Sequence, residues 1–322
     1  MLKINKRIKW IMATLLAAIL LILPGCDNES PLDTLVGSTT LRLSMKGIMV
    51  NPDPNIQDVD WEVYVKTLRL IGFQEGKQVV NHKINNLSSY KVQGTAPDTY
   101  IEIPLNENIE AAIKKGTLNL FAVANEEDAN FTDNTFPDNI TAQQLEALEV
   151  TAKASYNAPD ADNPFLMSAQ INTTLVVEES SIDVKLVRTV GKVELHSVKL
   201  EDQTEVKDNV TSYSLSATGN VYVTYPLFTG TGTGTGAIAL NNATATDTPL
   251  YLSEAAANTV TIEVAVTYDG KEYKGSFSDE QIIRNRCIQI NATIKQAEEN
   301  NCLLLESTIQ NWIPKELKPE YN

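Results

Sequence analysis

Apolar and polar residues alternate with a period of two along much of this chain, which is the spacing of half-buried β-strands. In residues 40–46, Leu41, Leu43 and Met45 fall on one face of such a strand and polar residues on the other. Further strands are predicted at 63–73, 78–84, 101–105, 117–124, 180–188, 192–200, 212–217, 221–224, 248–252, 259–268, 271–277, 284–295 and 302–310. Many short strands with turns between them favour sandwiches over a parallel sheet. The sequence therefore predicts a mostly β fold.

The connections between these strands carry their own signals. Asp269-Gly270 is typical of a two-residue hairpin, and residues 74–77 predict a similar turn. Two short helices are expected in the first half, at 107–115 and at 141–148, where Thr141 can act as the N-cap. Thr and Gly alternate over residues 229–236, which predicts a mobile loop. We place a domain boundary at Gly191, which divides the chain into domains at 39–190 and 191–322.

The N-terminus has the features of a bacterial export signal. Basic residues precede an apolar run at 11–23, which is shorter than the roughly 20 residues that a spanning helix needs. Leu23-Pro24-Gly25-Cys26 resembles a lipobox, so we expect cleavage before Cys26 and a lipid on its sulfur. Residues 1–25 are then a signal peptide and residues 26–38 a lipidated tether, at the surface of the outer membrane. The alternative is an ordinary secretory signal followed by a chance cysteine.

Charge excludes one class of partner. The net charge of the chain is −15, and removal of residues 1–25 takes away four basic residues and no acidic one, which makes it −19. Nucleic acid would be repelled by such a surface, and the sequence has no basic patch. We therefore expect no nucleic-acid partner.

Residues typical of catalysis are scarce. The chain has two histidines, His82 and His196, and neither they nor the cysteines have the spacing of a metal site. Residues 125–128 form an acidic run that is typical of a solvated loop. Asp160, Asp162 and Asn163 do not match a calcium-binding loop, so we interpret them as a polar turn. We expect no catalytic residue, no cofactor and no bound metal, although a pair of glycosidase carboxylates stays possible in principle.

Two cysteines remain after Cys26. Cys287 and Cys302 lie on successive predicted strands, with Cys302 close to the turn and Cys287 well away from it. A disulfide needs two residues that lie opposite each other. We therefore predict two buried free thiols.

Several short segments, which occur in one order from about residue 40 to the end, resemble a known family. They are residues 65–73 with 79–81, residues 120–126, residues 165–168, residues 184–198, and residues 283–287 with Trp312. Their order is similar to that of the fimbrillins, the subunits of type V pili in the Bacteroidales. The resemblance implies two transthyretin-like β-sandwich domains, with a few short helices in the first.

The resemblance also implies a mode of assembly. In such pilins an outer-membrane lipoprotein precursor is cut by an extracellular protease specific for Arg or Lys, the N-terminal strand leaves, and a strand from a neighbouring subunit takes its place. Here residues 41–45 fit the removable strand, and Arg42, Lys46 and Arg69 are the basic candidates for cleavage. Lys46 suits cleavage best, because it is expected just past the strand in a loop. The implied partners are other fimbrial subunits, the outer membrane through Cys26, and a surface ligand.

Two other functions compete with a shaft, tip or anchor subunit of a fimbria. A monomeric surface lipoprotein could bind glycan, but such sites usually carry exposed aromatic residues, and Trp61 and Trp312 only flank predicted strands. A hydrolase would need a catalytic constellation that the sequence does not show. The fimbrial subunit is therefore favoured.

Overall fold

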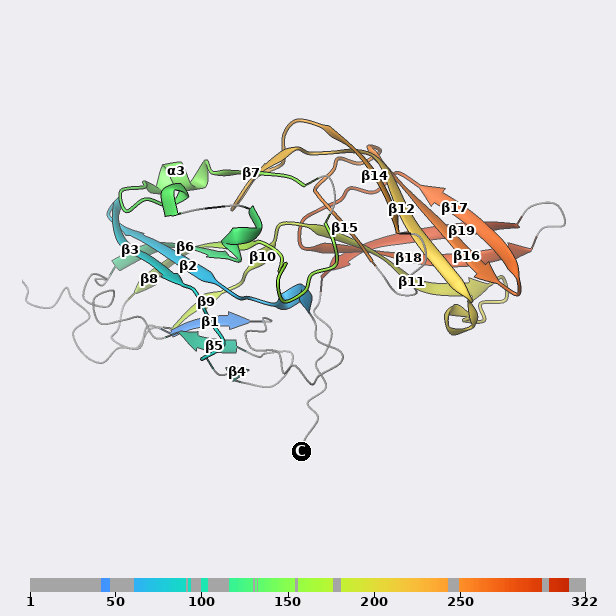
Figure 1. Cartoon of the computed structure of the whole chain (residues 1–322), viewed down its shortest axis with the longest axis horizontal. Coiled ribbons are helices and arrows are strands. Elements are labelled where there is room, and N and C mark those ends of the chain that lie inside the picture. The colour runs from blue at the N-terminus through green and yellow to red at the C-terminus, as the bar shows by residue number, and fades with distance from the viewer. Residues whose placement is uncertain are drawn as a thin grey trace, which may run out of the picture.

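Strands dominate the computed structural model, which describes residues 42–46, 61–90, 92–93, 100–103, 116–129, 131, 133–153, 156–175, 181–242, 249–296 and 301–312. They form two bodies that follow one another along the long axis of the molecule (Figure 1). The first body contains residues up to about 190, and the second contains most of the rest.

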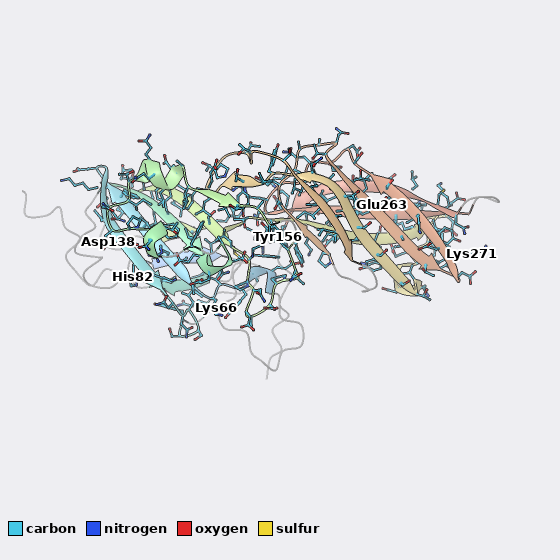
Figure 2. All side chains as sticks on the ribbon, turned by 45° about the horizontal axis from the view of Figure 1, so that its top comes forward. Lys66, His82, Asp138, Tyr156, Glu263 and Lys271 are labelled. Carbon is cyan, nitrogen blue, oxygen red and sulfur yellow. The ribbon has the colours of Figure 1, made fainter. Side chains whose placement is uncertain are left out.

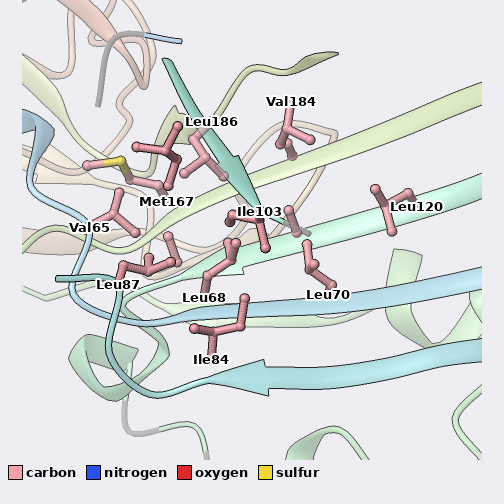
Figure 3. Close-up of a cluster of buried hydrophobic side chains, with 14 of the residues drawn as sticks. Val65, Leu68, Leu70, Ile84, Leu87, Ile103, Leu120, Met167, Val184 and Leu186 are labelled. Carbon is pink, nitrogen blue, oxygen red and sulfur yellow. The ribbon is translucent and has the colours of Figure 1, made fainter. Parts of the chain in front are cut away.

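The first body is a sandwich of two sheets. The larger sheet consists of β10 (Val187–Arg188), β8 (Met167–Leu175), β6 (Gly116–Ala124), β2 (Leu68–Gln74) and β3 (Lys77–Ile84), in that spatial order. The smaller sheet consists of β4 (Val92–Gln93), β5 (Tyr100–Ile103), β1 (Arg42–Lys46) and β9 (Ser181–Val184). Leu68, Leu70 and Leu120 of the larger sheet share one core with Ile103 and Val184 of the smaller sheet (Figure 3).

A second layer covers the other face of the larger sheet. Phe73 and Phe121 point to this side and pack with Leu145 of helix α3 (Ala142–Glu146) and with Val150 of β7 (Glu149–Thr151). The Thr141 side chain caps α3 by accepting a hydrogen bond from the Gln144 backbone N–H. The Gln144 side chain in turn accepts a hydrogen bond from the Thr141 backbone N–H. This capping box confirms the predicted helix start. The other predicted helix, at 107–115, lies outside the described residues.

The second body is one eight-stranded sheet that folds around its own core. Its spatial order is β14 (Gly236–Asn242), β12 (Ser212–Val221), β16 (Val260–Tyr268), β17 (Lys271–Phe277), β19 (Asn301–Asn311), β18 (Arg286–Gln296), β11 (Gly191–Leu200) and β15 (Leu250–Leu252). Residues of β12 and β16 share a core with residues of β11 and β18. The mostly β fold with sandwich packing is thus confirmed.

Both predicted tight turns are confirmed. Glu75 and Gly76 have φ of 50° and 75°, and Asp269 and Gly270 have φ of 48° and 70°. Two consecutive positive φ angles match the right-handed twist of the strands that they join.

The domain boundary proposed at Gly191 coincides with the start of β11. A Cβ at this position would lie 2.8 Å from Ile282 Cγ2 and 2.9 Å from the Ile283 carbonyl oxygen. Only glycine fits so close an approach, because those atoms belong to the packed second body. The division itself stays a proposal.

Several segments depart from the sequence-based prediction. Strands β8 and β14 were not predicted, and the strand predicted at 180–188 is two strands, β9 and β10, in different sheets. The strand predicted at 221–224 is instead the end of β12 followed by β13 (Thr224–Pro226), which pairs with β7 of the first body. The Thr-Gly loop that follows is held by hydrogen bonds, since Thr233 N–H donates to Thr224 O at 2.7 Å and Arg284 Nη2 donates to Gly230 O at 2.7 Å. Residues 222–236 of the second half of the chain therefore extend over the first body and pair with it. We call this segment the strap.

Candidate assembly site

Strand β1 lies in the middle of the smaller sheet. It runs antiparallel to β5, with Leu43 opposite Ile103 and Met45 opposite Ile101. It also runs parallel to β9, with the same two residues opposite Ile182 and Val184. Strand β1 therefore has a partner on each side.

The neighbours of β1 belong to the core of the first body. Ile101, Ile103 and Val184 are fully buried, and Ile182 is 2% exposed. The Leu43 and Met45 positions thus lie in register with two buried residues each. That they bury their own side chains stays a prediction, and Leu41 lies outside the described residues.

This arrangement makes β1 different from an edge strand. Departure of an edge strand leaves one unpaired ladder, whereas departure of β1 leaves two, one on β5 and one on β9. Unpaired N–H and C=O groups next to apolar side chains form a template for another strand. The position of β1 therefore defines a candidate assembly site between β5 and β9.

The candidate cleavage residues lie elsewhere than expected. Lys46 is not in a loop past the strand, because it is the last residue of β1 and lies opposite Tyr100. Arg42 is the first residue of β1, opposite Ser181. Arg69 is 4% exposed and forms an ion pair with Glu126, with Nε to Oε2 at 2.7 Å. Arg69 is therefore not accessible to a protease, and Arg42 and Lys46 are held by strand pairing.

The structure also corrects the prediction for the acidic run at 125–128. The run was expected to be a solvated loop, yet Asn125 and Glu126 are each 1% exposed. Asn125 Nδ2 donates to the carbonyl oxygens of Tyr64 and Phe165, at 2.9 and 2.8 Å. A buried polar group needs such partners. The sequence contained no local signal for this network, because Leu68-Arg69-Leu70 has the alternation of a half-buried strand, and only the structure shows that β2 is buried at every position.

A buried polar cluster joins the two bodies around Glu62, which lies in the 3₁₀ turn η1 (Trp61–Val63). Its carboxylate accepts hydrogen bonds from Tyr251 Oη at 2.6 Å and from Trp312 Nε1 at 2.7 Å. Lys192 Nζ lies 3.0 Å from Glu62 Oε1 and 2.9 Å from Glu194 Oε2. All these partners belong to the second body, so Glu62 is a link between the two bodies. Sequence reasoning missed it, because a single Glu before a strand carries no local signal.

Within the Glu62 cluster, neighbouring charges favour the charged forms of Lys192 and Glu194. Burial alone would lower the pKa of Lys192, but Glu62 and Glu194 outweigh it and the pKa is raised above 10.5. Burial would likewise raise the pKa of Glu194, but Lys192 outweighs it and the pKa is lowered below 4.5. Both groups are therefore ionised at neutral pH.

Aromatic rings close the junction. Trp312 stacks on Tyr251, with ring centroids 5.9 Å apart, and the Arg188 guanidinium lies 4.5 Å from the centroid of the Trp312 ring. Trp312 is 5% exposed. It therefore offers no surface for stacking on a sugar, and the glycan-binding alternative loses this residue.

The remaining candidates are dispersed. Cys287 and Cys302 are both free, as predicted, but only Cys287 is buried, because Cys302 lies exposed near the end of the hairpin opposite Lys295. Burial raises the pKa of the Cys287 thiol. His82 lies on β3 of the first body (Figure 2) and His196 on β11 of the second. The described residues contain no group of three or more His, Cys, Asp or Glu side chains arranged to hold a metal ion.

In the described part of the chain, no helix has the length and apolar character to cross a bilayer. Cys26 and the signal segment lie outside the described residues, so lipidation stays a prediction.

Comparison with known proteins identifies the fold. No family model and no curated protein sequence matches the chain. Among solved structures, a fimbrial assembly protein from Parabacteroides distasonis is 13% identical, with a TM-score of 0.54 over 84% of this chain and 94% of that one. The tip fimbrial protein Mfa3 from Porphyromonas gingivalis, with C-terminal truncation, is 16% identical, with a TM-score of 0.50 over 84% and 100%. A fimbrilin (FimA) from the same species is 12% identical, with a TM-score of 0.50 over 87% and 99%.

These similarities extend over nearly the whole length of each solved chain. The protein therefore has the fold of the fimbrial subunits of the Bacteroidales, and the resemblance seen in the sequence is confirmed at the level of the fold.

Proposed function

We propose that the protein is a structural or tip subunit of a cell-surface fimbria, exported as a lipoprotein on Cys26 and assembled by strand exchange at the site between β5 and β9. The observation that carries this proposal is the position of β1, which is near the N-terminus in sequence but central in its sheet. The fold shared with fimbrial subunits supports it. The role is structural, and the protein needs no catalytic residue.

The sequence around β1 suits removal of this strand. Lys46 ends β1, and the next basic residue is Lys66. A cut after Lys46 would detach the lipidated N-terminus together with the whole of β1. Since Lys46 is paired with Tyr100, the protease acts when the end of the strand opens, so cleavage follows local unfolding. A protease that also accepts arginine could cut after Arg42 and leave most of β1 in place.

The incoming strand comes from a neighbouring subunit. Between β5 and β9 it would satisfy both ladders, and alternate apolar side chains would replace those of Leu43 and Met45. Within this chain β19 is a poor donor, because β18 pairs with all eleven of its residues and Leu303 is buried. Residues 313–322 contain Pro314 and Pro319, and proline cannot donate to a ladder.

The test is N-terminal sequencing of the protein recovered from surface polymers. A start at Gly47 in the polymer and at Cys26 in the unpolymerised fraction is the expected result. The matched variant Lys46→Gln should keep its N-terminus and fail to enter polymers. Polymers whose subunits still begin at Cys26 would contradict strand exchange, and a Lys46→Gln variant that polymerises normally would contradict cleavage at this residue.

A further inference from the structure

Strand β14 is an edge strand without the usual protection. It pairs with β12 over all seven residues, with no shift in register, and it ends the eight-stranded sheet. Its sequence, Gly-Ala-Ile-Ala-Leu-Asn-Asn, contains no charged residue and no proline. Charges, prolines, bulges and short lengths are what keep edge strands from pairing with other chains.

The other described sheet edges carry at least one of these protections. Strand β3 contains Lys77 and Lys83 and lies next to a bulge at Gly72. The edges formed by β4 and β10 are two residues long, and β15 is three residues long. Strand β9 has four residues and contains Asp183. Among the edges that the structure describes, β14 therefore stands apart as both long and uncharged.

We propose that β14 is a self-association edge, on which β14 of a second copy of this chain pairs antiparallel around a two-fold axis at Ala239. Ala239 is the middle residue of the strand, so this register pairs all seven residues of one copy with all seven of the other. It places Ile238 of each copy opposite Leu240 of the other. Ile238 is 5% exposed and Leu240 is half-buried against the core of the second body, so pairing would cover Leu240 and join the two cores.

The chemistry of the edge fits a second copy better than another partner. The chain carries a net charge of −15, and two such chains can approach most easily where neither presents a charge. Ala237 and Ala239 are exposed, and their small side chains allow two backbones to approach. A basic partner would need acidic residues at the edge, and β14 has none.

Such a contact is weak between single molecules. A seven-residue strand pair buries far less than the about 1,200 Å² of a stable complex. Where the same contact repeats along two neighbouring polymers, each contact that forms raises the effective concentration for the next one. The repeated contacts therefore bind more tightly than a single contact. Where the chain forms fimbriae, this edge would hold them side by side. Self-pairing of isolated molecules does not depend on strand exchange, so it can fail or succeed independently of the proposed function.

Disulfide trapping tests the register directly. In the full chain with Cys26→Ala and Cys302→Ser, the buried Cys287 is the remaining native thiol. Directly opposed residues have Cβ atoms about 4.5–5.5 Å apart, which lies close to disulfide geometry. Ala239→Cys should therefore give covalent dimers under mild oxidation. The matched control is Thr218→Cys, which is exposed on β12 directly opposite Ala239 but does not lie on the edge.

We expect dimers of Ala239→Cys to form at least about tenfold faster than those of Thr218→Cys. Equal rates would overturn the proposal. A second pair of variants avoids any effect of the thiols: at high protein concentration, Ala239→Lys should abolish the dimer seen by sedimentation velocity, and Thr218→Lys should retain it. A protein that shows no concentration-dependent dimer at all, or an Ala239→Lys variant that keeps it, would also refute self-pairing on β14.

Discussion

The Glu62 carboxylate accepts hydrogen bonds from the phenol of Tyr251 and the indole of Trp312. Its Oε1 also lies 3.0 Å from Lys192 Nζ. Each of these donors is buried. Removing one partner of a buried ion pair is costly, because the remaining charge loses its compensation. At the scale of single residues, this side chain therefore joins three side chains of the second body to the first.

The first prediction concerns this carboxylate. Glu62→Gln should lower the free energy of unfolding by about 2–4 kcal/mol, less than a complete loss of the pair because Glu194 still faces Lys192. Urea denaturation measures the change. In the Lys192→Met background the same substitution should cost clearly less, since the charge that it leaves unpaired is absent. Equal costs in both backgrounds would show that the ion pair contributes nothing to stability.

A second prediction follows from the lowered pKa of Glu194. The unfolded chain takes up a proton at Glu194 at a higher pH than the folded chain. The stabilisation is therefore complete above about pH 4.5 and is lost as the pH falls through the lower pKa of the folded state. Lys192, with its raised pKa, contributes at every pH below about 10.5.

Unfolding by urea at about pH 7 and about pH 3 tests this. Glu194→Gln should destabilise the protein at the higher pH, and the difference from the unmodified protein should shrink at the lower pH. The control is the same substitution in the Lys192→Met background, where the change in pH dependence should be smaller, because Lys192 lowers the pKa of Glu194. A Glu194→Gln variant with an unchanged acid limb would contradict the prediction.

At the scale of elements, the sequence predicted the strands well and their partners less well. Period-two alternation identifies a strand such as β16 or β18 because one face is buried, and turn residues such as Asp269-Gly270 fix its local neighbour. Alternation does not name a distant partner. The central position of β1 depends on Ile103 and Ile182, which lie 60 and 139 positions after their partner Leu43, and no local pattern records such a pairing.

The candidate site shows the same limit. The sequence identified residues 41–45 as the removable strand and placed Lys46 in a loop, since Lys46-Gly47 resembles the end of a strand, whereas Lys46 is the last residue of β1. Burial of Arg69 and Glu126 was missed for a related reason. Each charge looks exposed in isolation, and its partner lies 57 residues away.

Strand β1 carries the third prediction. We predict that Leu43 and Met45 bury their side chains, and burial of each contributes roughly 1.5–3 kcal/mol. A protein that begins at Gly47 should therefore unfold at lower temperature and form higher oligomers on a sizing column. Addition of a synthetic peptide of residues 40–46 should reverse both effects, and a peptide of the same composition in scrambled order should not. A truncated protein that stays monomeric with unchanged thermal stability would refute the role of β1 as a latch.

At the scale of the whole molecule, the proposed attachment of the protein to the outer membrane and the cohesion between its two bodies are separate questions. We predict that attachment is through Cys26, so the fourth prediction is that Cys26→Ala abolishes labelling by a fatty-acid analogue. Cys302→Ser is the control and should be labelled normally, because its thiol lies far from the lipobox in sequence. Labelling that persists without Cys26 would show that the lipobox interpretation is wrong.

Cohesion depends on several contacts, because Tyr251, Cys287 and Trp312 of the second body pack in a core of the first. Two further links involve hydrogen bonds. One link is the Glu62 cluster. The other is the strap, where Leu227 N–H donates to Leu148 O at 2.8 Å and Ser168 Oγ donates to Leu227 O at 2.5 Å. Tyr225 of the strap is 1% exposed and lies in the core of the first body. Because these links and the shared packing tie the two bodies together, we expect the protein to unfold as one unit.

The last prediction separates the two links by calorimetry. Tyr225→Ala removes a buried ring, at a cost of about 3–5 kcal/mol. This variant and Glu62→Gln should each unfold in one transition at lower temperature, because the other link remains. The double variant should lose cooperativity, with a calorimetric enthalpy of unfolding above the van't Hoff enthalpy, because both links are weakened. Leu145→Ala with Glu62→Gln is the matched control: Leu145 is fully buried in the same cluster as Tyr225 but belongs to the first body, so this pair should lower stability and keep the two enthalpies equal. Unequal enthalpies in the unmodified protein, or equal enthalpies in the Tyr225→Ala, Glu62→Gln double variant, would show that these two links do not couple the bodies.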